Sequence, residues 1–119
     1  MDEDYCDDYG NEYYPVAKTD ADLRDVDSFF LDRKGLFYLV PYCNHSAFAR
    51  TKGTDIDDLE RQGWIHVSNH HYYTFRKPTN SQLKKLEKWA DINQFDIGQI
   101  IKDIEYCVEE RQQWEASRA

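Results

Sequence analysis

Two pairs of short apolar segments, each pair joined by a turn, stand out in the middle of the chain. Residues 29–31 and 36–40 flank a polar segment that ends in Gly35, and a glycine there can adopt the positive φ that tight turns need. Residues 64–68 and 72–76 are rich in β-branched and aromatic residues and are separated by an Asn-His-His turn. The pattern therefore predicts two β-hairpins.

Apolar residues three and four positions apart predict helices around these hairpins. A first helix is expected to start at the N-cap Thr19 and to carry Leu23, Val26 and Phe30 on one face. Between the hairpins, residues 45–52 and 54–62 are expected to form short helical turns. Thr54 is predicted to cap the second of these, and Gly63 to end it.

Two longer helices are predicted after the second hairpin and Pro78. Thr79 and Gln82 have the spacing of a capping box for a helix that continues to about Ile92 and buries Leu83, Leu86, and Trp89 or Ala90. A last helix over residues 96–115 carries the most regular apolar stripe in the chain, made by Ile97, Ile100, Ile101, Ile104 and Val108.

These elements predict an α+β fold in which the two hairpins form one small antiparallel sheet and the last two helices pack across a face of it. We expect a single domain over residues 18–119, preceded by an N-terminal arm over residues 1–17. If so small a sheet leaves part of the isoleucine stripe uncovered, the stripe favours a homodimer through the C-terminal helix.

Several features of the middle of the chain occur together in a known group of proteins. They are a hairpin on a polar-Gly turn, His45 shortly after it, the segment Gly63-Trp64-Ile65-x-Val67, and a helix that begins near Gln82-Leu83. Over residues 29–90 the chain thus resembles small proteins common in tailed-bacteriophage genomes. Those proteins often have Arg between the Ile and the Val, where this chain has His66. The resemblance implies a phage origin and a location in the cytoplasm of the bacterial host, and it brings no assigned active site.

The net charge of -8 is concentrated at the N-terminus. Residues 1–30 contain ten acidic residues and two basic ones, and tyrosines alternate with carboxylates in the first half of this segment. Carboxylates along an arm can imitate phosphates, and tyrosines supply contact area that a plain solubilising tail lacks. We therefore expect a non-catalytic protein that binds and modulates or inhibits a host protein, for example a defence nuclease, through nucleic-acid mimicry. The expected partner-binding residues are Asp2, Glu3, Asp4, Tyr5, Asp7, Asp8, Tyr9, Glu12, Tyr13 and Tyr14.

The opposite charge in the middle of the chain supports an alternative. Residues 33–88 contain ten basic and five acidic residues. A nucleic-acid-binding face on the second hairpin and the helix after it would combine stacking rings with cations. Its residues would be Tyr72, Tyr73, Phe75, Arg76, Lys77, Lys84, Lys85 and Lys88. A sequence pI near 4.9 opposes this alternative, because nucleic acid repels an acidic chain at long range.

The four histidines raise a second alternative, a histidine-dependent metal enzyme or nuclease. His66, His70 and His71 lie close together, and His45 approaches them if its helix packs beside the second hairpin. Strand alternation puts His66 on the face opposite Ile65 and Val67, where we expect solvent. His70 and His71 are expected at an exposed turn. We therefore predict no metal site, no cofactor and no catalytic residue, while the convergence of the histidines stays open.

Composition limits the remaining possibilities. The 119 residues include no apolar run long enough to cross a membrane and no signal-peptide pattern at the start. Cys6, Cys43 and Cys107 are odd in number and far apart, which argues against a disulfide framework and favours a reducing cytoplasm.

Overall fold

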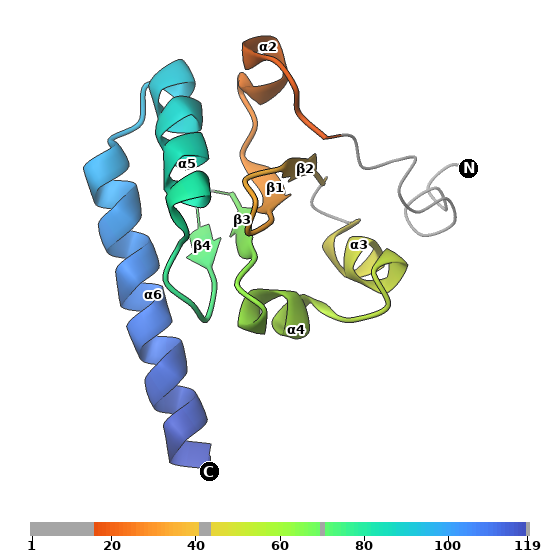
Figure 1. Cartoon of the computed structure of the whole chain (residues 1–119), viewed down its shortest axis with the longest axis vertical. Helices are drawn as coiled ribbons and strands as arrows, with labels where there is room; N and C mark the ends of the chain where they lie inside the picture. The colour runs from red at the N-terminus through yellow and green to blue at the C-terminus, as the bar shows by residue number, and fades with distance from the viewer. Residues whose placement is uncertain (1–15, 41–43, 70, 119) are drawn as a thin grey trace.

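The computed structural model describes residues 16–40, 44–69 and 71–118, which form a four-stranded antiparallel sheet between two layers of helices. The order of the strands is β2-β1-β3-β4. They are β1 (Ser28–Leu31), β2 (Phe37–Leu39), β3 (Ile65–Ser68) and β4 (His71–Tyr73). The two long C-terminal helices cover one face and two short helices lie at the other (Figure 1). The predicted α+β fold, with both hairpins in one sheet, is confirmed.

The first hairpin follows the sequence pattern closely. The Asp32 carboxylate accepts hydrogen bonds from the backbone N–H groups of Lys34 (2.9 Å) and Leu36 (3.0 Å), and Gly35 has the expected positive φ of 96°. The second hairpin is shorter than predicted. Its outer strand β4 ends at Tyr73 because the chain then turns toward the preceding helix, where the Phe75 N–H donates to the Glu60 carbonyl at 3.1 Å.

The N-terminal helix α2 (Asp20–Leu23) also ends earlier than the apolar spacing predicts. Thr19 caps it as expected, in a capping box with Asp22, and Leu23 is buried. The helix cannot continue to Phe30 because Asp25 takes a positive φ of 62° and because Phe30 belongs to β1, where it pairs with Tyr38 of β2. Pairing within the sheet thus overrides the helical spacing of these apolar residues.

Two short helices, α3 (His45–Thr51) and α4 (Ile56–Arg61), connect the hairpins. The N-cap of α4 is Asp55 and not Thr54, since the Asp55 carboxylate accepts from the backbone N–H of Asp58 at 2.8 Å. Gly63 follows α4 with a φ of 103°, as its predicted role at the helix end requires.

Helix α5 (Asn80–Asn93) begins with the predicted capping box of Thr79 and Gln82. Leu86, Trp89 and Ala90 are buried, whereas Leu83 is half-buried. The fully buried Gln82 amide also donates to the carbonyls of Leu31 (3.2 Å) and Gly63 (2.9 Å). One side chain therefore caps α5 and ties it to both hairpins.

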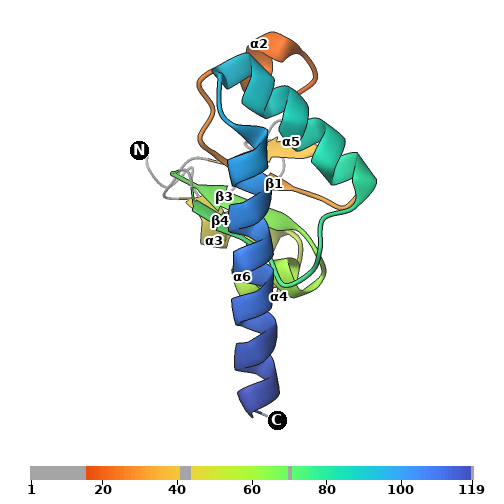
Figure 2. The same cartoon turned by 90° about the vertical axis from the view of Figure 1, so that its left-hand side faces the viewer.

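Helix α6 (Ile97–Arg118) packs antiparallel to α5 and continues across β4 to α4. Ile100, Ile104 and Val108 are buried and Ile97 and Ile101 are half-buried, so the stripe is largely used within the chain. This coverage weakens the reason for expecting a homodimer. The last turns of α6 project beyond the other elements in both views (Figures 1 and 2).

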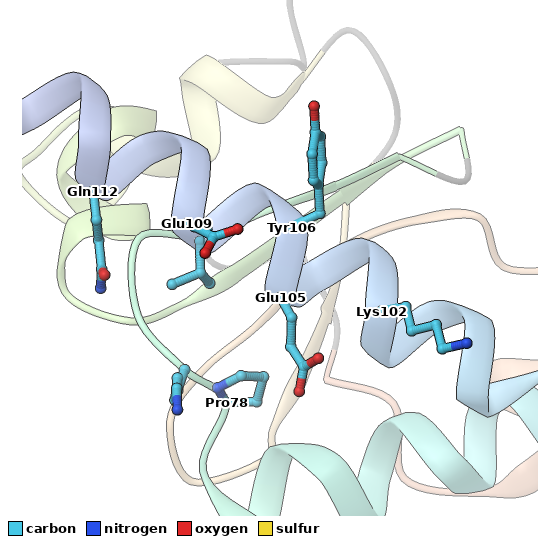
Figure 3. A pocket seen from close by; sticks show the side chains of 8 residues that line it. Pro78, Lys102, Glu105, Tyr106, Glu109 and Gln112 are labelled. Atoms are coloured by element: carbon cyan, nitrogen blue, oxygen red, sulfur yellow. The ribbon is translucent and has the colours of Figure 1, made fainter.

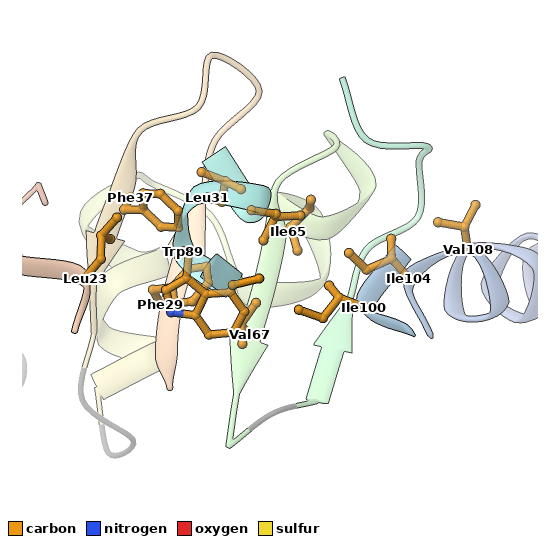
Figure 4. Packing of buried hydrophobic residues seen from close by; sticks show 12 residues of the cluster. Leu23, Phe29, Leu31, Phe37, Ile65, Val67, Trp89, Ile100, Ile104 and Val108 are labelled. Atoms are coloured by element: carbon orange, nitrogen blue, oxygen red, sulfur yellow. The ribbon is translucent and has the colours of Figure 1, made fainter. Parts of the chain in front are cut away.

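The main hydrophobic core lies between the sheet and helices α5 and α6. Trp89 occupies its centre beside Phe29, with a ring centroid separation of 5.2 Å (Figure 4). The Trp89 indole N–H donates to the Val26 carbonyl at 2.9 Å. A smaller cluster on the other face contains Phe30, Val40, Phe48, Ala49 and Leu59. No helix within the described ranges is both long and apolar enough to span a membrane.

Candidate functional site

A row of four rings crosses the sheet on the face toward α3 and α4. The strand registers place Tyr38, Phe30, His66 and Tyr73 side by side on β2, β1, β3 and β4. His66 lies on the face opposite Ile65 and Val67, as strand alternation predicts, but the prediction that it faces solvent is wrong. It is only 8% exposed and stacks on Phe30 with centroids 4.7 Å apart, because α3 and α4 cover this face.

A buried carboxylate orients His66. The Nδ1 atom of His66 is 3.0 Å from Oε2 of Glu60, whose other oxygen accepts a hydrogen bond from Arg111 of α6. The Glu60 side chain is 3% exposed. Removing it from water is costly, and the two donors compensate for that cost. The contact also ties α4, β3 and α6 together.

His45, at the start of α3, lies against His66 with ring centroids 4.5 Å apart. The Ser28 hydroxyl donates to the Val40 carbonyl at 2.6 Å and lies 3.0 Å from Nε2 of His45. Since the only hydroxyl hydrogen of Ser28 is used in the first bond, Nε2 of His45 is the donor in the second. His45 and His66 therefore converge, a point that the sequence left open.

The chemistry of this cluster is limited by its enclosure. A carboxylate-oriented histidine has the arrangement of a general base or of a metal ligand with its outer-shell partner. However, Ser28, His45, Glu60 and His66 are each at most 9% exposed, and Nε2 of His66 has no hydrogen-bond partner within the described part of the chain. Among the described residues, no group of three or more His, Cys, Asp or Glu side chains is arranged to hold a metal ion. The polar contacts of the cluster join α3, α4 and α6 to the sheet.

His71 is exposed at the start of β4, on the strand rather than in the turn. His70 lies outside the described residues.

The residues of the alternative nucleic-acid face do not share one surface. Phe75 is 8% exposed, and the guanidinium groups of Arg61 and Arg111 lie 5.1 and 4.9 Å from its ring centroid, so little of the ring is open to a base. Tyr72 packs on the main core, and burial, with Asp103 nearby, raises its pKa to about 12. Tyr73 points to the opposite face, toward His66.

The basic residues of that alternative are exposed but dispersed. Arg76 donates to the Arg61 carbonyl at 3.0 Å, and Lys77 follows it in the connection to α5. Lys84, Lys85 and Lys88 are exposed on α5, where Lys88 is 3.1 Å from the Asp20 carboxylate. Strand alternation puts Tyr72 and Tyr73 on opposite faces of the sheet, so the rings of this alternative do not form one stacking surface.

The predicted partner-binding residues of the acidic arm all lie outside the described residues. The described chain begins at Val16, which forms a bridge with Tyr38, and the Ala17 N–H donates to the Phe37 carbonyl at 3.0 Å. The last two residues of the segment 1–17 therefore extend the sheet at the outer edge of β2.

A second acidic surface, not singled out in the sequence analysis, lies on α6. Asp103, Glu105, Glu109 and Glu110 are exposed around Tyr106, and no basic residue occurs between Asp103 and Glu110. We call these five residues the acidic ridge. The Tyr106 side chain is 63% exposed, and its hydrogen bond to the Glu110 carboxylate raises its pKa. The signal was present in the sequence, since these positions repeat at helical spacing opposite the isoleucine stripe.

Two open grooves flank the ridge. One has a volume of about 550 Å³ and lies between α6 and the Lys77-Pro78 connection, with Lys102, Glu105 and Glu109 on its α6 side (Figure 3). The other has a volume of about 450 Å³ and is lined by Asp57, Arg61, Phe75, Glu110, Arg111 and Trp114. We call the second one the Trp114 groove. Trp114 is 47% exposed there.

Comparisons with known proteins add no relative. No family model, no curated protein and no solved structure matches the chain.

Proposed function

We propose that the protein acts without catalysis, by binding the basic surface of a partner protein and so modulating or inhibiting it. The observation that carries this proposal is the acidic ridge, a set of four exposed carboxylates around an exposed tyrosine on a rigid helix. From Asp103 to Glu110 the helix rises about 10 Å. Such a surface attracts lysine and arginine side chains at long range and offers an aromatic contact at short range.

The acidic arm extends the same proposal. Its carboxylates and tyrosines have the composition of a segment that imitates nucleic acid, and a host nuclease is the kind of partner this would suit. The described chain begins beside β2, at the edge of the sheet opposite β4 and α6. Val16 and the ridge thus lie on different sides of the domain, and the arm and the ridge can be tested separately.

Catalysis is the weaker explanation because His66, the histidine that a carboxylate orients, is enclosed. Any substrate of the Glu60–His66 pair would have to displace the ring of Phe30 or α3 and α4. Nucleic-acid binding is weaker because Phe75, the central ring of the proposed face, is buried and already contacts two guanidinium groups.

A capture experiment with competition tests the proposed function. The full chain is immobilised, incubated with bacterial lysate and eluted with duplex DNA at constant ionic strength. If the partner binds the chain through the partner's own nucleic-acid-binding surface, the DNA should release one protein that was captured in a stoichiometric amount. Retention of the DNA by the immobilised chain itself, or a captured protein that the DNA does not release, contradicts the proposal.

The same captured protein tests the role of the arm. A variant without residues 1–15 keeps the sheet-edge contacts of Val16 and Ala17 and should stay folded. If the truncated variant no longer binds the captured protein, the result supports the arm as the segment that imitates nucleic acid. Undiminished binding would exclude the arm and leave α6 as the acidic surface.

A further inference from the structure

The outer face of α6 is built differently from that of an ordinary solvent-facing helix. Besides its carboxylates it exposes two large aromatic side chains, Tyr106 and Trp114, while the inner face is firmly attached to the domain. Arg111 binds Glu60, and the Gln112 amide donates to the Phe75 carbonyl at 3.2 Å. The backbone of α6 is therefore held to the domain by contacts that exist before a partner binds.

The charges of the Trp114 groove determine what it can accept. Both of its guanidinium groups already have carboxylate partners: Arg61 lies 3.0 Å from Glu115, and Arg111 binds Glu60. Asp57 and Glu110, by contrast, are exposed at the groove. The carboxylates thus supply the available charge, and the exposed ring of Trp114 supplies the apolar surface.

We propose that the acidic ridge and the Trp114 groove together bind a Lys/Arg-rich segment of a protein partner that also carries an apolar side chain. The basic side chains lie along the ridge, and the apolar side chain enters the groove beside Trp114. This inference rests on the proposed function and specifies its binding surface and the chemistry of its partner. A second copy of the chain fits this surface poorly, because two acidic ridges repel each other.

The test uses a synthetic 18-residue peptide of alternating Lys and Leu pairs and the full-length protein. Binding is followed by the anisotropy of a dye on the peptide and by tryptophan emission. The wild type should bind with a blue shift of that emission, and Trp114→Phe should lose the shift, because Trp64 and Trp89 are at most partly exposed. A shift that persists in Trp114→Phe contradicts the groove.

Matched charge variants distinguish binding at the acidic ridge from general attraction by the net charge of the chain. The ridge variant is E105Q/E109Q/E110Q, and the control is D20N/E87Q/D91N, which removes three exposed carboxylates elsewhere. We expect about tenfold weaker binding for the ridge variant and less than threefold for the control, because close charge pairs act locally. Equal weakening by both variants would show nonspecific attraction and overturn the inference.

An aromatic pair of variants gives a second comparison. Tyr106→Ala should mainly speed dissociation of the peptide, roughly tenfold, since buried aromatic contacts act on residence time. The control Leu36→Ala shortens another exposed apolar side chain, which is 41% exposed in the first hairpin, and should leave dissociation unchanged. Equal rates for both variants would contradict a role for Tyr106.

The captured partner distinguishes failure of this inference from failure of the proposed function. If the ridge variant binds the DNA-releasable partner as tightly as the wild type, the inference is wrong while the function stands. If the wild type captures no DNA-releasable protein, the proposed function fails. Weaker capture by the ridge variant than by its matched control supports both.

Discussion

The two faces of the sheet are stabilised in different ways. The face toward α5 and α6 is apolar, with Trp89 at its centre and long helices over it. The face toward α3 and α4 mixes rings with a buried network of Glu60, His66 and Arg111. Two long amphipathic helices cover the first face, whereas helices of seven and six residues cover the second. The first face is therefore held mainly by apolar packing, to which Trp89 and Gln82 add hydrogen bonds, and the second combines a smaller apolar cluster with buried ionic contacts.

The largest expected effect is on the apolar face. Trp89→Ala removes a fully buried indole and its bond to Val26 and should lower the free energy of unfolding by about 3 to 5 kcal/mol. Urea denaturation followed by circular dichroism measures it. The exposed Trp114→Ala is the control and should change stability by less than about 0.5 kcal/mol. If Trp89→Ala lowers the free energy of unfolding less than variants on the face toward α3 and α4, the apolar face is not the main source of stability.

Disruption of the polar face should come next. Glu60→Gln keeps the volume but leaves Arg111 and His66 without their shared carboxylate, at a cost of about 2 to 3 kcal/mol. Glu115→Gln breaks only the exposed pair with Arg61 and should cost less than about 0.5 kcal/mol. If the two variants are equally stable in urea denaturation, the buried network does not hold this face together.

High pH should act on the apolar face through Tyr72. Its pKa is raised to about 12 in the folded chain, against 10 for the free group. Between these values the unfolded chain loses the proton first, so stability is complete below pH 10 and falls as the pH rises toward 12. After allowance for solvent screening, Tyr72→Phe should reduce this loss by about 1 to 2 kcal/mol. Urea midpoints at pH 9 and pH 11.5 check it, and identical losses in both proteins would contradict the burial of this hydroxyl.

The smallest expected effect concerns Ser28. Ser28→Ala removes the hydroxyl that joins the Val40 carbonyl to His45 and should cost about 1 kcal/mol. Ser46→Ala, at an exposed position of α3, is the matched control and should be neutral. Thermal unfolding of the pair resolves the difference, and a neutral Ser28→Ala would show that the Ser28–His45 contact is dispensable.

The sequence by itself determined the elements whose signals are local. The Thr19 and Thr79 caps, the Gly35 turn and the apolar stripe of α6 depend on neighbours within a few residues, so the pattern was sufficient to find them. The acidic ridge belongs to the same class, because its helical spacing could have been read beside the stripe.

Only the tertiary structure decided which polar residues are buried. Strand alternation placed His66 on the correct face, but whether α3 and α4 cover that face depends on packing between segments far apart in the chain. The contacts of Glu60 with His66 and with Arg111, 51 residues later in the chain, have no local signature. The same holds for Phe75, which is buried where Arg61 of α4 and Arg111 of α6 lie beside its ring. Burial is a property of the assembled layers, and the sequence of one strand does not contain it.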